Sequence, residues 1–231
     1  MLFDVVHEVQ ARVETLVSSR LKQAEGDVDC LKQGMNSLSD DAKERLGKLE
    51  QYALRSVLET AGMRYASALK EWTAKTRAML VYDSKVDPFT DDGLFQAVKG
   101  KPNIAIISAT TDGDVFGGFY SVAVMGQDKF FRDPNIFAFS FESHGRCATP
   151  QRFDVKEENK GRACVRFFKD NGNGWFVTFY GGAGGFFLGN EKSRTFCTNL
   201  SDAFEGIEDT TLTGNNREFF TCTRLIAIQL E

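Results

Sequence analysis

The stretch Ile104–Val124, IAIISATTDGDVFGGFYSVAV, decides the fold of the C-terminal part of this chain. Two runs rich in β-branched and aromatic residues flank Asp112-Gly113. Asp-Gly between such runs is a strong hairpin signal, because both residues tolerate the positive φ of a tight turn. The second run contains Val115-Phe116-Gly117-Gly118, and paired glycines inside a strand allow a close backbone approach or place a bulge. The stretch therefore predicts two antiparallel strands.

The composition changes near residue 75. All four prolines and all but one of the 21 phenylalanines lie beyond this point, whereas the preceding part is rich in Leu, Ala, Glu, Lys, Arg and Gln. These six residue types favour helices, while Phe, Val, Thr and Gly suit strands joined by tight turns. The sequence predicts a helical segment at residues 1–75 and a β domain at residues 76–231.

The helical segment carries apolar residues at alternating steps of three and four, the spacing of a coiled-coil seam. A long helix cannot bury such a seam alone, so the pattern predicts a dimeric coiled coil and self-association through residues 1–75. The alternative is an antiparallel helical hairpin that turns at Gly34–Ser37 and restarts at Ser39 with acidic residues in its first turn. The first apolar run consists of Val6, Val9, Val13 and Leu16.

The β domain contains many short candidate strands separated by turn residues. Lys169–Gly174 predicts a second hairpin turn, and Asp91–Val98 and Ser201–Glu205 predict short helices. Together with the helical segment, this organisation predicts an α+β chain whose main domain is an antiparallel two-sheet β sandwich with a Phe-rich core, including Phe167 and Phe168. The candidate strands are Arg77–Tyr82, Asn103–Ala109, Val115–Val124, Ile136–Glu142, Gln151–Val155, Ala163–Phe168, Trp175–Tyr180, Gly185–Leu188 and Phe219–Leu230.

The net charge and the cysteines argue against several classes of protein. The formal net charge of −4 argues against a general nucleic-acid binder, which needs a basic face. Five widely spaced cysteines without a C-x-x-C form neither a disulfide framework nor a zinc pattern, and they indicate reduced thiols. The sequence shows no signal-peptide pattern and no apolar run near the ~18 residues of a membrane span. These features predict a cytoplasmic protein without a metal or cofactor.

Gly181, Gly182, Gly184 and Gly185 form a glycine cluster that could be taken for a phosphate-binding loop. A phosphate loop requires G-K-[ST] after its glycines, and here two phenylalanines follow. The cluster therefore predicts a tight turn or a sheet corner.

Ser143, His144, Arg146 and Cys147 lie between two candidate strands, and Arg152 follows shortly after. Neighbours in sequence do not make a catalytic triad, which needs groups adjacent in space. We interpret these residues as a loop that contacts a partner. Cys147 has a cation, Arg146, as its direct neighbour, so a thiol-dependent antioxidant enzyme using Cys147 is an alternative function.

Three segments follow the order of motifs in a known family. Ile104–Ile107 with Thr111–Phe119 is similar to an I-x-x-T-x-G-x-V-F-G-x-F hairpin, Asp133–Ser140 to an F-L-F-S strand, and Gly181–Leu188 to a glycine-rich segment. Through these segments, residues 76–231 resemble the TLDc domain of eukaryotic oxidation-resistance proteins. The chain departs from the family pattern in two places. The Asn-Pro after the family's S-x-T-F region is missing, and residues 142–150 form an unusual insert.

The resemblance implies a β sandwich without an established catalytic centre. It also implies a link to oxidative-stress protection and a protein partner such as a subunit of the vacuolar proton-pumping ATPase. We therefore expect a non-catalytic interaction or regulatory protein of the TLDc type. A coiled-coil scaffold or a nucleic-acid-associated regulator is a further alternative, and the acidic charge disfavours nucleic acid.

Overall fold

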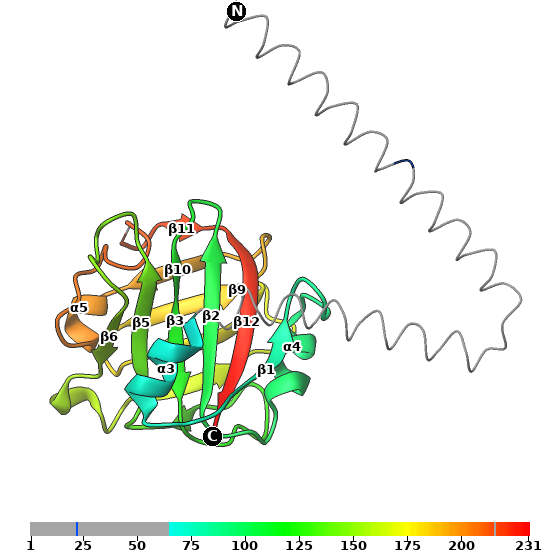
Figure 1. The fold of residues 1–231 in the computed structure, drawn as a ribbon, viewed down its shortest axis with the longest axis horizontal. Helices are drawn as coiled ribbons and strands as arrows, with labels where there is room; N and C mark the ends of the chain where they lie inside the picture. The colour runs from blue at the N-terminus through cyan, green and yellow to red at the C-terminus, as the bar shows by residue number, and fades with distance from the viewer. Residues whose placement is uncertain (1–21, 23–64, 215) are drawn as a thin grey trace, which may run out of the picture. The chain divides into compact units, whose positions relative to one another are not determined.

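The computed structural model describes residues 22, 65–214 and 216–231. Residues 65–231 form two six-stranded sheets that pack face to face (Figure 1). Every pairing within the sheets is antiparallel, so the predicted two-sheet sandwich is confirmed. The predicted coiled-coil seam, its helical-hairpin alternative and self-association through them concern residues outside the described part.

The first sheet has the strand order β1 (Ala78–Asp83), β12 (Cys222–Leu230), β2 (Ile104–Thr110), β3 (Val115–Tyr120), β5 (Phe137–Glu142) and β6 (Gln151–Asp154). The second sheet has the order β11 (Phe219–Phe220), β10 (Thr195–Thr198), β9 (Gly185–Gly189), β8 (Trp175–Tyr180), β7 (Cys164–Phe167) and β4 (Phe131–Arg132). The helices within residues 65–231 are α3 (Ala66–Thr73), α4 (Asp91–Val98), α5 (Leu200–Ala203) and the 3₁₀ turn η2 (Glu157–Asn159). None of the described helices is long and apolar enough to span a membrane.

The predicted β2–β3 hairpin is confirmed, with Ala109 opposite Val115 next to the turn. The turn residues adopt only part of the expected geometry, because Gly113 has a φ of 85° whereas Asp112 does not have a positive φ. The Thr110 N–H donates to the Asp114 carbonyl at 3.0 Å and closes the loop. This is a three-residue connection with glycine at the left-handed position.

The glycine pair in β3 serves close packing on both faces of the strand. A Cβ on Gly118 would lie 2.4 Å from the Phe179 ring of the second sheet. A Cβ on Gly117 would lie 1.9 Å from the Ile106 carbonyl oxygen and 2.8 Å from the Phe139 ring. The predicted close approach is thus confirmed, and the register shift against β5 falls just before the pair, between Val115 and Phe116.

Some strands begin or end at other residues than the sequence predicts, because other contacts replace the backbone hydrogen bonds between strands there. β3 ends at Tyr120, because the Ser121 N–H and hydroxyl bind the Asp133 carboxylate. The predicted strand Phe219–Leu230 is two strands, β11 in the second sheet and β12 in the first, so the chain changes sheets at Thr221. Strands β4 and β10 were not predicted, whereas α4 has the predicted bounds and Thr90 Oγ1 caps it by accepting from the Gly93 N–H at 3.0 Å.

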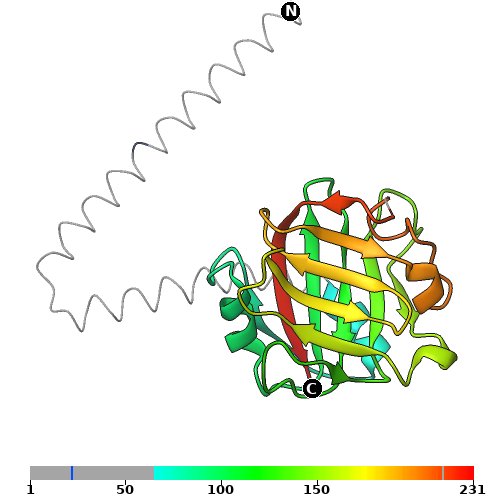
Figure 2. The same ribbon diagram turned by 180° about the vertical axis from the view of Figure 1, so that it is seen from behind.

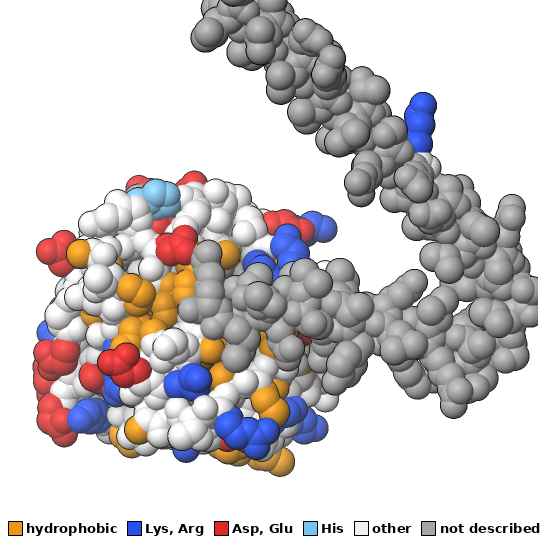
Figure 3. All heavy atoms as spheres, in the orientation of Figure 1, with side chains coloured by type: hydrophobic (Ala, Val, Ile, Leu, Met, Phe, Trp, Pro, Cys, Tyr) orange, Lys and Arg blue, Asp and Glu red, His pale blue; other side chains and the backbone are white. Residues whose placement is uncertain are grey.

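Helix α3 packs on the outer face of the first sheet (Figure 1). Leu69 is fully buried there, and the Trp72 ring stacks on Phe141 with a centroid distance of 5.6 Å. The helix ends at Ala74, whose left-handed backbone lets its N–H return to helix carbonyls. Figure 3 shows hydrophobic side chains gathered in the middle of this side of the sandwich. Although α3 lies before residue 76, it therefore covers the β domain.

Candidate functional site

The loop after β5, residues 143–150, folds onto the tip of the β2–β3 hairpin. Arg146 Nη2 lies 2.5 Å and His144 Nδ1 2.9 Å from the same oxygen, Asp114 Oδ1. The Asp114 side chain is only 2% exposed, whereas the Arg146 side chain is 26% exposed. Arg146 Nε also donates to the Thr211 carbonyl at 3.0 Å. Arg146 thus joins the loop, the hairpin and the segment that contains Thr211.

The other predicted loop residues have local roles. The Cys147 N–H donates to Ser143 Oγ at 2.7 Å, and His144 and Gly145 adopt positive φ values of 50° and 82°. These contacts shape the loop from within. The contact of this loop with a partner stays a prediction. The Arg146 guanidinium is already engaged within the chain, by Asp114 and the Thr211 carbonyl.

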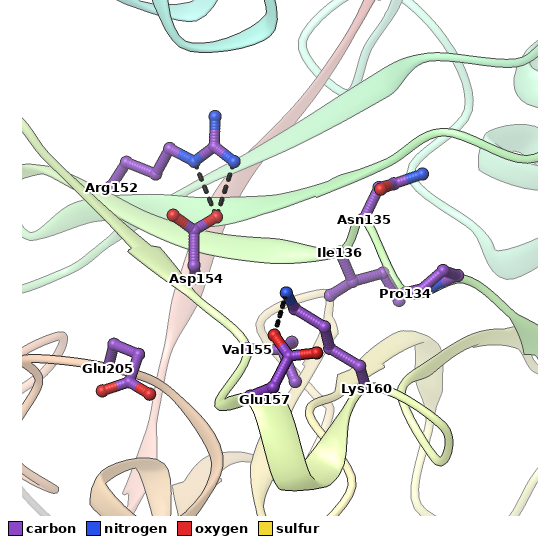
Figure 4. A pocket seen from close by; sticks show the side chains of 9 residues that line it. All are labelled: Pro134, Asn135, Ile136, Arg152, Asp154, Val155, Glu157, Lys160 and Glu205. Carbon is purple, nitrogen blue, oxygen red and sulfur yellow. Dashed lines mark hydrogen bonds and ion pairs between the residues drawn. The ribbon is translucent and has the colours of Figure 1, made fainter.

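Arg152 lies on β6, outside the loop. Its guanidinium binds Asp154 and the Trp72 carbonyl, and it covers the Phe137 ring at 4.2 Å. It thereby ties α3 to the edge of the first sheet. Figure 4 shows the neighbouring pocket of about 360 Å³, in which Arg152 points toward Asp154 and Lys160 toward Glu157. Because both cations face carboxylates, the pocket offers little attraction to an anion.

The glycine cluster forms the β8–β9 turn, as predicted for a tight turn. The Gly181 N–H donates to the Gly184 carbonyl at 2.8 Å, and Gly182 has a φ of 89°. Gly185 begins β9 opposite Tyr180. A Cβ on Gly184 would lie 2.0 Å from the Asn199 carbonyl oxygen, so the turn is packed against protein.

The described cysteines are mostly core residues. Cys164, Cys197 and Cys222 are buried among the core residues. Burial raises the pKa of the Cys197 and Cys222 thiols to about 12 and also raises the pKa of Cys164. These three thiols are therefore poor sources of thiolate at neutral pH. Cys147 is half-buried, and its redox role stays a prediction.

No group of three or more His, Cys, Asp and Glu side chains that could hold a metal ion is found among residues 65–214 and 216–231. The most distinctive surface in this part of the chain is instead aromatic, and it lies on the outer face of the second sheet.

The pairing register of the strands brings these side chains together on the outer face of the second sheet. Arg166 lies opposite Thr178, Thr178 opposite Phe187, and Phe187 opposite Phe196. Phe196 in turn lies opposite Phe219. Directly opposed residues in a sheet share a face. Figure 2 shows this sheet from its outer side, where no described helix covers it.

The rings on this face contact one another in a continuous series. Trp175 and Phe187 have a centroid distance of 4.4 Å, Phe187 and Phe196 stack at 4.7 Å, and Phe196 meets Phe219 edge-on at 6.2 Å. Phe219 is 61% exposed at one end of the series. We call the set Phe130, Arg166, Phe168, Trp175, Phe187, Phe196 and Phe219 the aromatic face.

A pocket of about 410 Å³ lies at the Arg166 end of the aromatic face. The guanidinium carbon of Arg166 lies 5.0 Å from the Phe130 ring centroid and 4.6 Å from that of Phe168. Phe130 is 63% exposed and forms the outer wall. The lining residues are Phe130, Arg166, Phe168, Trp175, Thr178, Tyr180 and Phe187.

The aromatic face was not predicted from the sequence, although the sequence contains a signal for it. Consecutive side chains in an extended segment point to opposite faces, so a Phe-Phe pair in or beside a strand places one ring away from the core. Phe168 is buried, as expected, but it lies outside the two core clusters and packs against Trp175 and Arg166. The four pairs are Phe130-Phe131, Phe167-Phe168, Phe186-Phe187 and Phe219-Phe220.

The sequence of this chain matches a known protein family. A family model described as the TLDc domain matches residues 56–225. The matched region begins before α3, so it includes the helix that covers the first sheet. No curated protein matches the chain.

Proposed function

This chain belongs to the TLDc-domain family, and from that premise we propose that it is a non-catalytic interaction protein linked to the oxidative-stress response. The observation that supports this proposal is the aromatic face. Aromatic and arginine side chains carry much of the binding energy in protein interfaces. Phe130 and Phe219, at the two ends of this face, are 63% and 61% exposed, and exposed apolar surface commonly marks an interaction site.

We propose a subunit of the vacuolar proton-pumping ATPase as the first partner to test. The resemblance to the TLDc family implies this partner. The sandwich supplies a rigid support for such a contact, because four of the aromatic residues lie on strands of the second sheet. They are Trp175, Phe187, Phe196 and Phe219.

Co-purification from native cells tests the proposal. The full chain is tagged and compared with a Phe130→Asp/Phe219→Asp variant, which changes the two exposed ends of the aromatic face. Met79→Asp, on the first sheet, is the matched control. We expect pump subunits with the wild type and the control, and their loss from the double variant.

Equal recovery of the same partners by all three proteins would show that the aromatic face does not bind them. Peroxide consumption that requires the Cys147 thiol would contradict the non-catalytic assignment. In that case the thiol-dependent antioxidant activity becomes the better account of the chain.

A further inference from the structure

Arg166 has an unusual environment for an arginine at a protein surface. Its guanidinium lies against the rings of Phe130 and Phe168, and its side chain is 28% exposed. Aromatic rings attract the cation, but they accept none of its N–H groups in the manner of an oxygen atom. The two rings therefore remove water from the guanidinium without replacing all of its hydrogen bonds.

The hydrogen bonds of Arg166 are incomplete. Nη2 donates to Asp128 Oδ1 at 3.3 Å, which is long for a charged pair, and Asp128 is half-exposed. Nε is buried and has no hydrogen-bond partner. A buried donor without an acceptor is unfavourable, and a ligand oxygen relieves this cost once the pocket wall moves far enough to admit it to Nε.

The surrounding pocket limits what can bring this oxygen. Arg166 is the one charged side chain among the seven residues that line it, and most of the other walls are aromatic. A guanidinium with a planar pair of N–H groups favours a carboxylate, which can accept from both. The aromatic walls favour apolar groups on either side of that carboxylate.

We propose that the Arg166 pocket binds the carboxylate of an Asp or Glu side chain, carried by an extended apolar segment of the protein partner that lies along the aromatic face. This inference rests on the proposed function and names the chemistry of its partner. The segment lies on the face rather than adding a strand, because the edge strands β4 and β11 each have only two residues.

Single-stranded nucleic acid is the competing ligand, since it also stacks on aromatic rings. It needs a positive groove that follows its backbone. The cations that contact rings of the aromatic face are Arg166 and Arg194, and Asp128 lies beside the first. This charge pattern favours an acidic peptide over a polyanion.

Selection from a displayed library of random 12-residue peptides tests the inference. The full-length wild type, Arg166→Gln, Arg166→Lys and the distant control Arg77→Gln are used as separate targets. We expect wild type and Arg77→Gln to enrich peptides with Asp or Glu between apolar residues. Both Arg166 variants should lose the acidic preference, because Gln removes the charge and Lys removes the Nε donor.

Affinity measured through tryptophan fluorescence in a Trp72→Phe background, where Trp175 is the remaining tryptophan, gives a second readout for the best selected peptide. Replacing its acidic residue by the amide should weaken binding to wild type at least tenfold and leave binding to Arg166→Gln unchanged. Unchanged thermal unfolding of each variant confirms that its fold is retained. A stable second variant, Phe130→Ser, should weaken the same peptide because it opens the pocket wall.

Three results would overturn the inference: no enriched peptides, enrichment without acidic residues, or equal acidic preference in Arg166→Gln. Binding of oligo(dT) that Arg166→Gln abolishes would assign the pocket to nucleic acid instead. If peptides fail while Phe130→Asp/Phe219→Asp still loses its cellular partners, only this inference fails. If acidic peptides bind but that variant keeps its cellular partners, the proposed function fails.

Discussion

Arg146 Nη2 lies 2.5 Å from Asp114 Oδ1 and joins the loop after β5 to the tip of the β2–β3 hairpin. Asp114 is almost completely buried, so the guanidinium compensates a carboxylate that water cannot reach. Arg146 also reaches the Thr211 carbonyl, so one side chain holds three chain segments together. We expect this end of the sandwich to depend on the pair.

Arg146→Ala should lower the free energy of unfolding by about 2–4 kcal/mol, because it leaves the Asp114 charge buried without its main partner. Urea denaturation with linear extrapolation measures the loss. The matched control is Arg77→Ala, whose pair with Glu231 is exposed and 3.6 Å long. An exposed pair of this kind contributes less than about 1 kcal/mol. Equal losses in the two variants would contradict the structural role of Arg146.

Replacing each β3 glycine by alanine should lower stability by an amount that depends on the atoms nearest to the added Cβ. Gly118→Ala places a methyl group 2.4 Å from the Phe179 ring and should cost about 1–3 kcal/mol, because the ring must shift within the core. Gly117→Ala should cost more, since the 1.9 Å neighbour is a backbone oxygen of β2. Gly161→Ala meets open space and should change stability by no more than about 0.5 kcal/mol. Thermal unfolding of the three variants ranks them, and the reverse order would contradict this packing.

Helix α3 should be part of the folding unit of the sandwich. Leu69→Ala should destabilise the chain by about 2–4 kcal/mol, because this residue of α3 is fully buried against the first sheet. The control Ser67→Ala lies on the exposed side of α3 and should have little effect. Chemical denaturation gives both values.

Truncation examines the same contact in another way. A chain of residues 55–231 keeps α3, whereas a chain of residues 76–231 loses it and uncovers Phe137, Phe139 and Phe141. We expect the shorter chain to bind more of the dye ANS than the longer one and to unfold at a lower temperature. Identical unfolding of the two chains would show that α3 contributes nothing to the sandwich.

The thiols should differ in reactivity according to burial. Iodoacetamide at pH 8 should modify Cys147 in the native protein and spare Cys164, Cys197 and Cys222 until the chain unfolds. Mass-spectrometric mapping of the modified peptides identifies each site. Rapid native modification of Cys197 or Cys222 would contradict their burial.

The same thiols predict a pH dependence. Burial raises the pKa of Cys197 and Cys222 from 9.0 to about 12, so the unfolded chain releases these protons at a lower pH than the native chain. The native state binds more protons between these values, and the free energy of unfolding should fall as pH rises from about 9 toward 12. Urea midpoints at pH 8 and pH 10 measure this fall. A rise in stability over this interval would contradict the assignment.

Much of the fold follows from local sequence. Asp112-Gly113 and Lys169–Gly174 mark hairpin turns that the structure contains, since turn chemistry acts over a few residues. The bounds of α4 were predicted because the acidic residues of its first turn are a local signal, and the structure adds Thr90 as the cap. The short strands β4 and β10 were not predicted, because their place in the second sheet depends on partners distant in sequence.

The sequence by itself determined that residues 76–231 form an antiparallel sandwich, because alternation, turns and composition are local properties of the chain. Only the tertiary structure decided which ring of each Phe-Phe pair faces the core, because cross-strand register assigns the faces. It also decided that Arg146 pairs with Asp114 across 32 positions and that Arg166 lies between Phe130 and Phe168. Such contacts depend on the packing of distant segments, which a local pattern does not specify.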